Sequence, residues 1–472
     1  MPWPGGPTGD CGSAEARFMD GRLRSPRLPE SFSGRLVLIA AVGVAIRLAH
    51  LILIAADNQL SGDAAAYHLS ANLFADGLGF PEPLRHLFGA SEQILRNGET
   101  LTVTTPIGHL EPTAGHPPGW TVILGVLAFL GATTVGQQQA ASILLGIPSI
   151  VLAGLLGREL RSERLGLIAA GLTAGYAFIW VNDGLLVAET AAIAAAAGTM
   201  LVGLRFSRDP TRRQALLFGI VGGLAALIRA ELLLFLPLVA TAVMLRSRLP
   251  WRERCLRYAV AGFSALLVLS PWLVRNLLVF EEPVLLSNGV GTVMVQANCD
   301  RTYSGEHLGY WQITCGHPQP YGPAGELLDE SERDAVVRER ALDYMDANRQ
   351  RLVTAVIPAR VGRMWAVYRP IQQIRLDVLV EGRSMAVSTL GLVQYYVLMP
   401  LALLGAILLW RRRGPLLAVT AWIPIVTLTA AAAFGNTRYR TAAEMSVVIL
   451  AAVAIDALVG HRTAQPDLEQ VG

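Results

Sequence analysis

Asp63 is the first residue whose type and position could support catalysis. It follows Gly62 and stands one helical turn before Tyr67, so both side chains would lie on one face of a helix. A carboxylate in this position can accept the proton of a hydroxyl group or help to hold a divalent cation. The structural alternative is a helix N-cap, which is typical of an aspartate placed directly after a glycine.

Two further carboxylates, Asp183 and Glu189, lie where apolar segments end. An unpaired carboxylate is costly to bury there, so a function or an ionic partner is expected. A second acidic group in a cleft and a helix cap paired with an arginine are equally supported. Arg229 and Glu231 lie at another such end, where a structural ion pair is favoured over substrate binding.

Arginine supplies all 39 basic residues of the chain, because the sequence contains no lysine. Arg275 follows Trp272 near the end of an apolar segment, and Arg438, Tyr439 and Arg440 lie together between the last two apolar segments. Forked guanidinium donors suit a phosphate, although arginines at helix ends also commonly reach lipid headgroups. We expect Arg438 and Arg440 to be functional, whereas the two roles are equally supported for Arg275.

His116 precedes two prolines, which hold it in a rigid, extended turn. Such a turn positions a side chain well for hydrogen bonding to a phosphate or to a second substrate. A purely structural turn is equally supported. No closely spaced set of His, Cys, Asp and Glu resembles a zinc site, so no metal ligands are assigned, and Walker, Rossmann and nucleophile-elbow patterns are absent.

Cys299 and Cys315 share one polar loop, and we predict a disulfide between them. Closing a loop of this length contributes roughly 3 kcal/mol in the chain-entropy model. The loop contains Tyr303, Tyr310 and Trp311, whose aromatic faces suit a sugar ring but are also typical of an interfacial belt. The other two cysteines, at positions 11 and 255, fall in arginine-rich stretches that we place in the cytoplasm.

The composition indicates the elements that must position these side chains. Of the 472 residues, 53% are hydrophobic and only 16% are charged, whereas a soluble domain carries about 25% charged residues. Several apolar runs of roughly 18 to 25 residues match the thickness of a bilayer core. We therefore predict an all-α, polytopic integral membrane protein with about 10–11 transmembrane helices. The net charge of +3 is spread among short loops and does not favour nucleic-acid binding.

Apolar segments and arginine clusters together predict the topology. The apolar segments are 36–56, 119–134, 138–157, 163–181, 184–204, 214–229, 232–245, 256–279, 391–410, 415–434 and 441–460. Arginines mark the cytoplasmic side by the positive-inside rule, and they cluster before residue 36 and at 158–164, 205–213, 246–257 and 411–413. An even number of crossings follows, so we expect about ten, with 119–134 dipping in or forming one broken unit with the next helix.

This topology divides the chain into five parts and places every candidate residue on the outer side. The parts are a disordered cytoplasmic tail (1–35), an N-terminal transmembrane module (36–279) with a first outer loop (57–118), an extracytoplasmic segment (280–390), C-terminal transmembrane helices (391–460) and a cytoplasmic tail (461–472). The first span would be an uncleaved anchor. Within about 320–370, charged and apolar residues alternate as in an amphipathic helix that lies on the membrane or on the bundle.

The order of these motifs resembles a known superfamily over most of residues 36–460. The motifs are Gly62-Asp63 with Tyr67, Ala75-Asp76-Gly77 with Gly79-Phe80, His116-Pro117-Pro118, Gly157-Arg158-Glu159-Leu160, Asn182-Asp183-Gly184 with Glu189, and Arg438-Tyr439-Arg440 with Glu444. They resemble the GT-C superfamily, specifically glycosyltransferase family 39-like enzymes, which include protein O-mannosyltransferases and lipid A aminoarabinose transferases. That family usually has two adjacent acids in its first motif, whereas Ala64 follows Asp63 here, which argues against a metal at Asp63.

The resemblance implies a GT-C-type bundle in the cell membrane that transfers a sugar from a polyprenyl-phosphate donor to an extracytoplasmic glycan, lipid or protein. Asp63 would be the general base of a direct, inverting displacement. The residues expected to bind the substrates are Tyr67, His116, Asp183, Glu189, Arg229, Arg275, Arg438, Tyr439 and Arg440. No cofactor is certain, and a divalent cation, Mg²⁺ or Mn²⁺, is the one candidate.

Two other functions are compatible with the sequence. A transporter or flippase of a lipid-linked substrate would need charges buried at mid-membrane and broken helices in corresponding halves. Arg47 and His50 lie in the first span, but no acidic partner for them is evident in the sequence. A non-catalytic assembly subunit is the third option, because the first acidic motif departs from the family pattern.

Overall fold

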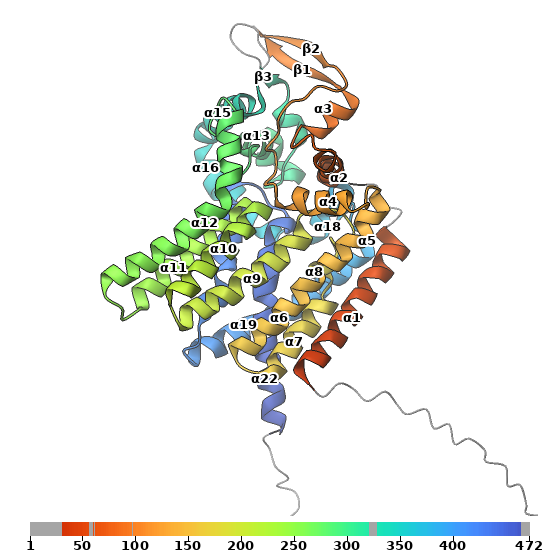
Figure 1. Cartoon of the computed structure of the whole chain (residues 1–472). Coiled ribbons are helices and arrows are strands. Elements are labelled where there is room, and N and C mark those ends of the chain that lie inside the picture. Colours follow the sequence, from red (N-terminus) through yellow and green to blue (C-terminus); the bar gives the residue numbers. More distant parts are fainter. Residues whose placement is uncertain (1–30, 56–59, 61, 97, 321–327, 464–472) are drawn as a thin grey trace, which may run out of the picture.

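Long apolar helices form the body of the protein in the computed structural model (Figure 1). The structure describes residues 31–55, 60, 62–96, 98–320 and 328–463. The predictions for the C-terminal tail beyond residue 463, for Cys11 and for most of the N-terminal tail lie outside these residues. The first described helix, α1 (Phe32–His50), begins at Ser31, whose side chain caps it by accepting from the backbone N–H of Gly34.

Six helical segments of the described chain are long and apolar enough to cross a membrane: Phe32–Ile54, Val135–Leu160, Glu189–Arg208, Trp251–Val279, Met385–Arg411 and Thr437–Gly460. They comprise α1 with η1 (Leu51–Ala55), α5 (Val135–Leu145) with α6 (Ile147–Leu160), α9 (Glu189–Arg208), α12 (Trp251–Val279), α19 (Met385–Arg411), and η6 (Thr437–Arg440) with α22 (Thr441–Thr463). The protein is therefore a multi-pass membrane protein, as its composition predicted.

Shorter apolar helices pack among these six. They are α7 (Glu163–Gly175), α8 (Ala177–Trp180), α10 (Arg212–Ile228), α11 (Phe235–Arg246), α20 (Leu416–Thr420) and α21 (Trp422–Ala432), with the turn η2 (Ala230–Leu234) between α10 and α11. The predicted total of about ten crossings needs several of them to span as well, and it stays a prediction. Helix α4 (Gly119–Phe129) packs on α2 (Gly62–Ala75) and lies across the end of the bundle, which agrees with a segment that does not cross (Figure 1).

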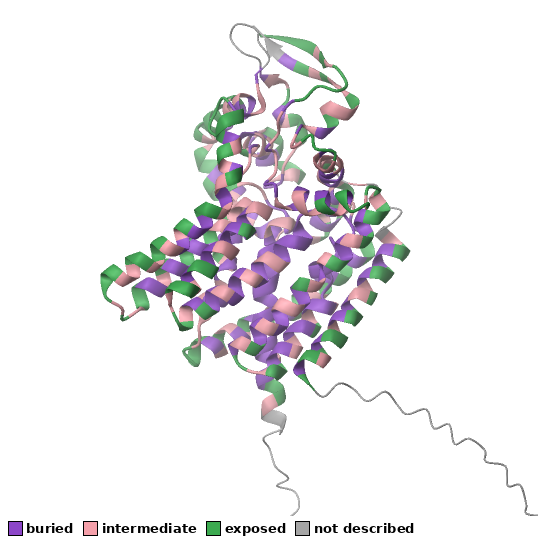
Figure 2. Cartoon of the chain, in the orientation of Figure 1, coloured by how far each residue is buried: buried purple, intermediate pink, exposed green. Residues whose placement is uncertain are grey.

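Helix α22 forms the buried centre of the bundle (Figure 2). It packs against α7, α9 and α19, and its many alanines and valines let neighbouring backbones approach closely. At Gly405 of α19 an added Cβ would lie 1.9 Å from the carbonyl oxygen of Leu450. Because no side chain fits in that gap, a glycine is required where α19 crosses α22.

A lobe outside the bundle carries the only strands among the described residues (Figure 1). Strands β1 (Ala90–Arg96) and β2 (Glu99–Thr105) pair antiparallel, and the short β3 (Gln319–Pro320) pairs parallel to β1. The predicted all-α class is confirmed, because the described chain is mostly helical, but this small sheet was not predicted. The sequence contains a signal for it, because Asn97-Gly98 is the commonest pair in two-residue hairpin turns and the residues after it are rich in threonine.

The rest of the lobe is helical and includes the predicted amphipathic helix, α15 (Glu330–Ala347). Its buried face, which includes Val337 and Ala341, packs on α13 (Val290–Ala297), so the packing-face interpretation is confirmed. The other lobe elements are α3 (Pro83–Phe88), α14 (Asp300–Tyr303), η3 (Gly305–His307), η4 (Ile313–Gly316), α16 (Arg349–Arg351) and η5 (Leu352–Val356). Helices α17 (Ile357–Met364) and α18 (Pro370–Glu381) follow and pack on α21 and α19 of the bundle.

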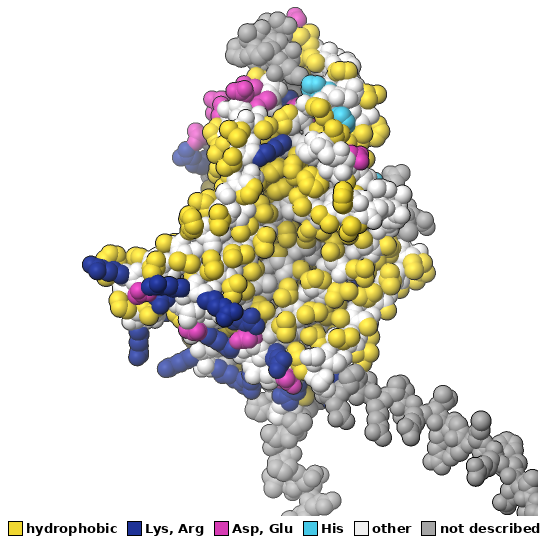
Figure 3. Space-filling model, in the orientation of Figure 1, with side chains coloured by type: hydrophobic (Ala, Val, Ile, Leu, Met, Phe, Trp, Pro, Cys, Tyr) yellow, Lys and Arg dark blue, Asp and Glu magenta, His cyan; other side chains and the backbone are white. Residues whose placement is uncertain are grey.

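Charge is distributed unevenly between the two ends of the molecule. Arginine side chains gather on the face of the bundle farthest from the lobe (Figure 3). Between that face and the lobe, the visible surface of the bundle is mostly apolar. The arginine clusters at 158–164, 205–213 and 246–257 begin or end helices at that side. The predicted arginine-rich loops thus share one end, and the lobe occupies the other.

Candidate functional site

Arg438 joins three carboxylates from distant parts of the chain. Its Nε donates to Glu189 Oε1 at 2.6 Å, and its Nη1 donates to Asp63 Oδ2 at 2.8 Å and to Glu381 Oε2 at 2.9 Å. The Arg438 side chain is 18% exposed and that of Asp63 is 38% exposed, whereas Glu189 is fully buried. One guanidinium therefore links a buried acid to a solvent-facing one.

Four helix ends bring these groups together on the lobe side of the bundle. Asp63 lies in the first turn of α2 and Glu189 in the first turn of α9, where the helix dipole favours a negative charge. Glu381 is the last residue of α18, and Arg438 lies in η6 just before α22. The membrane-spanning helices α9 and α22 are apolar along most of their length, and charged side chains lie at their ends. Four helix ends meet here.

Arg229 is the second cation of the cluster. Its Nη1 donates to Glu189 Oε1 at 2.6 Å and its Nε donates to Glu231 Oε1 at 2.6 Å. The predicted ion pair of Arg229 and Glu231 is confirmed, and the shared contact to Glu189 adds Arg229 to the group around Arg438. Four carboxylates and two guanidiniums are bonded together in this way, so the cluster has an excess of negative charge.

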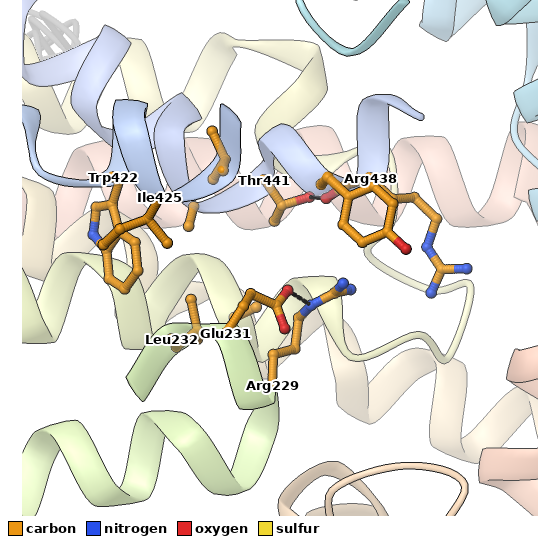
Figure 4. Close-up of a pocket in the computed structure, with 11 residues that line it drawn as sticks. Arg229, Glu231, Leu232, Trp422, Ile425, Arg438 and Thr441 are labelled. Carbon is orange, nitrogen blue, oxygen red and sulfur yellow. Dashed lines mark hydrogen bonds and ion pairs between the residues drawn. The ribbon is translucent and has the colours of Figure 1, made fainter. Parts of the chain in front are cut away.

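A small cavity separates the two arginines from an apolar wall (Figure 4). Its lining includes Arg229, Arg438 and Tyr439 together with Trp422 and Ile425. Its volume is about 10 Å³, which accommodates about one water molecule. Cationic groups and an apolar surface thus lie on opposite sides of one narrow space.

Asp63, His116 and Tyr67 form the exposed edge of the cluster. His116 Nε2 lies 3.9 Å from Asp63 Oδ1, and the rings of His116 and Tyr67 stack with their centroids 4.7 Å apart. The side chains of His116 and Asp63 are 39% and 38% exposed, whereas Tyr67 is buried. The predicted face shared by Asp63 and Tyr67 is present, and His116 covers Tyr67 there.

The charges around Asp63 keep it ionised. Burial alone would raise the pKa of Asp63, but Arg438, His116 and Arg229 lower it to about 2. Burial lowers the pKa of His116, and nearby arginines add to that effect against the pull of Asp63. Near neutral pH the edge therefore presents a carboxylate and a neutral imidazole.

Asp183 lies in a separate, buried ion pair. Its Oδ2 accepts from Arg47 Nε at 2.6 Å and its Oδ1 accepts from Thr190 Oγ1 at 2.7 Å, and both charged side chains are at most 2% exposed. Of the two roles left open for Asp183, the structure therefore favours pairing with an arginine. Asp183 is thus the acidic partner of Arg47 that was not evident in the sequence.

Arg275 also lies apart from the cluster and contacts the first outer loop instead. Its Nη1 donates to the carbonyl oxygen of Thr113 at 3.0 Å and its Nη2 to that of Phe80 at 3.3 Å. The guanidinium lies over the ring of Trp272, 4.9 Å from its centroid. Through these contacts Arg275 holds the first outer loop against α12. The sequence interpretation considered phosphate and headgroup binding for Arg275, but not this structural contact.

Arg440 is buried in the bundle, although it stands two residues from Arg438. Its Nε donates to Glu444 Oε1 at 2.5 Å, and its guanidinium lies 3.9 Å from the ring centroid of Tyr395. Tyr176 donates its hydroxyl to the other oxygen of Glu444. The structure therefore corrects the expectation for Arg440, which packs α22 against its neighbours and does not join the cluster.

The disulfide between Cys299 and Cys315 is confirmed, with a sulfur–sulfur distance of 2.04 Å. The aromatic residues of its loop continue toward the cluster. Trp311 lies beside Phe434, with ring centroids 6.1 Å apart, and Phe434 meets Tyr439 at 5.1 Å. A row of aromatic rings thus connects the disulfide loop to the cavity next to Arg438.

Glu381 and its neighbours are the site residues that the sequence interpretation missed. Near Glu381, Arg383 donates to Asn182 Oδ1 at 2.9 Å and to Thr437 Oγ1 at 2.8 Å, while Asp377 accepts from Thr437 at 2.6 Å. This network holds the turn that carries Arg438. The sequence contains a signal for these residues, because Glu381 and Arg383 stand directly before an apolar span. Charges at the end of a span usually have ionic partners.

No group of three or more His, Cys, Asp and Glu side chains is placed to hold a metal ion in the part of the chain that the structure describes. The acids nearest one another are bridged by arginines instead.

The chain matches one protein-family model and several solved structures. Residues 115–274, about a third of the chain, match the model described as dolichyl-phosphate-mannose-protein mannosyltransferase. This segment includes His116, Glu189 and Arg229. No curated protein sequence matches the chain.

The fold matches that of the oligosaccharyltransferase AglB from the archaeon Archaeoglobus fulgidus, solved in complex with an inhibitory peptide and a dolichol-phosphate. The TM-score is 0.50 at 15% sequence identity, and the match covers 92% of this chain and 51% of AglB. The chain thus spans about half the length of that enzyme. A match to ArnT from Cupriavidus metallidurans bound to undecaprenyl phosphate covers 92% of this chain and 80% of ArnT, at 17% identity and a TM-score of 0.39.

Proposed function

Since the chain has the GT-C membrane fold and contains a mannosyltransferase-type segment, we propose that it transfers a sugar from a polyprenyl-phosphate donor to an extracytoplasmic acceptor. The observation that carries this proposal is the contact of Arg438 with Asp63 at the solvent-facing end of the bundle. It places a candidate phosphate ligand within hydrogen-bonding distance of a candidate base. Fold similarity alone does not define a reaction, so the argument depends on these side chains.

Arg438 and Arg229 are suited to hold the phosphate of the donor. Both guanidiniums are partly exposed, at 18% and 16%, and both approach the same oxygen of Glu189. Glu189 occupies the point where they converge, so a phosphate that replaces Asp63 on Arg438 would meet a forked cation able to stabilise the charge of the leaving group.

Phosphate binding would change the state of Asp63. While Arg438 is bonded to Asp63, the pKa of this carboxyl is about 2, and the carboxylate is a weak base. A donor phosphate that takes up Arg438 removes this partner, so the pKa of Asp63 rises toward its ordinary value near 4. Asp63 would then accept the proton of the acceptor hydroxyl while the sugar is transferred.

The excess of acids in the cluster also bears on cation dependence. Four carboxylates already surround two guanidiniums, so a phosphate must displace one carboxylate or enter together with Mg²⁺ or Mn²⁺. Asp63 is the most exposed of the carboxylates bonded to Arg438 and would be displaced first. We propose that the phosphate displaces Asp63 and that the reaction proceeds without a metal ion. Assays with and without Mg²⁺ or Mn²⁺ test this.

The distribution of arginines supports an extracytoplasmic site. By the positive-inside rule the arginine-rich end of the bundle faces the cytoplasm. The lobe and the Arg438 cluster would then face outward, with the N-terminus inside. A cysteine-accessibility assay on intact cells, comparing the native exposed Cys255 with a single cysteine introduced at exposed Leu101, tests this orientation.

The decisive experiment follows the release of free polyprenyl phosphate. Purified protein in lipid is supplied with a panel of polyprenyl-phosphate sugars and candidate acceptors, with and without Mg²⁺ or Mn²⁺. Turnover of one donor by the wild type, and its loss in Asp63→Asn with normal membrane insertion, is the expected result. If intact protein turns over no donor, the transferase proposal fails, and flux of the lipid-linked sugar would be measured to test a transporter.

A further inference from the structure

A second cavity lies in the lobe, away from the Arg438 cluster. It has a volume of about 370 Å³, within the range of small-molecule binding sites. Its walls come from α3 and β1 of the first outer loop and from α13, β3 and α15 of the later segment. Two parts of the chain that are distant in sequence therefore line it.

The lining is polar and has an excess of acids. Glu82, Glu92, Glu330 and Asp334 face two arginines, Arg85 and Arg333. Both arginines are already bound by Glu111, and Arg85 also pairs with Glu92 at 2.5 Å. With its cations neutralised, the cavity disfavours an anionic ligand and offers carboxylate oxygens as hydrogen-bond acceptors.

Asn288 adds an unused hydrogen-bond donor to this lining. Its side chain is 8% exposed, and its Nδ2 has no hydrogen-bond partner among the described residues. This nitrogen is itself buried, so a rotation of the Asn288 side chain would bring it to the cavity, where a ligand oxygen could satisfy it. Thr292 and Gln319 supply further groups that both donate and accept.

The cavity is connected to the candidate site through one short segment. Ala114 donates its backbone N–H to Glu330 Oε2 at 3.1 Å and accepts from the backbone N–H of Asn288 at 2.7 Å. Two residues later along the chain, His116 stacks on Tyr67 and lies 3.9 Å from Asp63. A molecule in the cavity would therefore contact Glu330 and Asn288, which both bond to the segment that carries His116.

We infer that this cavity binds the acceptor, and that the acceptor is an uncharged, hydroxyl-rich glycan. Sugar hydroxyls donate to carboxylates and accept from amides, which matches the lining, while the exposed side chain of Leu84 offers apolar surface to a sugar ring. Acidic lining disfavours phosphorylated or uronic acceptors. This inference depends on the proposed function only for the role of the glycan as acceptor. Binding of the glycan itself is measured without the donor.

Binding of a linear neutral hexose oligosaccharide to the full-length protein in lipid nanodiscs, followed by saturation-transfer NMR, tests the inference. The wild type should bind this probe and should not bind an oligosaccharide of uronic acids. Thr292→Phe fills the cavity and should weaken binding more than tenfold. Asn288→Ala removes the unpaired amide and should weaken it about fivefold. Thr102→Phe, on an exposed position of β2 outside the lining, should bind like the wild type.

Three results would overturn the inference: unchanged binding in both cavity variants, preference for the uronic probe, or binding of a Ser/Thr-rich peptide in place of the glycan. A measurement of donor turnover distinguishes failure of this inference from failure of the proposed function. Normal polyprenyl-phosphate release with unchanged glycan binding in the variants contradicts only the cavity. Glycan binding that depends on Asn288 and Thr292, without any donor turnover, contradicts only the transferase.

Discussion

Arg438 and Asp63 are 375 residues apart in the sequence, yet the arginine Nη1 donates to the carboxylate Oδ2 at 2.8 Å. The contact connects the first turn of α2 to the turn before α22, at the edge where the side chain of Asp63 is 38% exposed. In the proposed reaction it connects the group that holds the donor phosphate to the group that receives the acceptor proton. Several measurable consequences depend on this contact.

Asp63→Asn should reduce the rate of polyprenyl-phosphate release at least 100-fold, because general-base catalysis typically contributes a factor of 10² to 10⁴. The amide still accepts a hydrogen bond from Arg438, so membrane insertion and thermal stability should change little. Asp76→Asn is the matched control, since Asp76 is an exposed aspartate just after the same helix. A variant at Asp63 that retains full activity would contradict its role as base.

Arg438→Lys should raise the KM for the donor about tenfold or more and lower kcat. Lysine keeps the positive charge but lacks the fork that reaches Glu189 through Nε and Asp63 through Nη1. Initial rates at varied donor concentration measure both constants. Arg412→Lys, an exposed change at the arginine-rich end of the bundle, is the control and should leave both constants unaltered.

The acid limbs of kcat and kcat/KM should occur at different pH values. In the free enzyme the pKa of Asp63 is about 2, so kcat/KM should persist at acidic pH as far as the protein stays folded. In the donor complex Arg438 is taken by phosphate, the pKa rises, and kcat should fall at pH values nearer 4. Rates measured between pH 3 and 8 decide this. Coincident limbs, or a kcat limb at the lower pH, would show that the donor does not displace Asp63.

Replacing Cys299 and Cys315 together by serine should lower the free energy of unfolding by roughly 3 kcal/mol, the chain-entropy value for a loop of this length. The bond closes the loop whose aromatic rings reach Tyr439, so activity should fall as well. Thermal unfolding in detergent, compared with Cys255→Ser at an exposed free cysteine, measures the effect. Equal unfolding temperatures for the two proteins would refute it.

Asp183→Asn should destabilise the protein by about 3 to 5 kcal/mol, the usual cost of removing one partner of a buried ion pair. The Arg47 side chain is 1% exposed and its Nε would lose its charged acceptor. The double variant Arg47→Met and Asp183→Asn should recover part of this loss. Full stability of Asp183→Asn combined with loss of donor turnover would instead return Asp183 to the catalytic cluster.

Local sequence patterns were sufficient for much of the architecture. Apolar runs of membrane length predicted the long helices, because a segment in lipid must satisfy its backbone hydrogen bonds internally, which a helix does. Proximity to the ends of these runs also identified Asp63, Glu189 and Arg438 as functional candidates, and the two cysteines of one polar loop as a disulfide. In each case the deciding interaction is between nearby residues or between the chain and its solvent.

The grouping of charges was decided by the tertiary structure alone. Arg438 and Arg440 are equivalent by type and position, but one meets Asp63 at the exposed edge and the other meets Glu444 in the core. Likewise Asp183 is paired by Arg47, and Glu381 reaches the cluster from α18. These pairings depend on which helix faces meet after packing. Their electrostatic free energy is a property of distance and burial in the fold, which the local sequence does not encode.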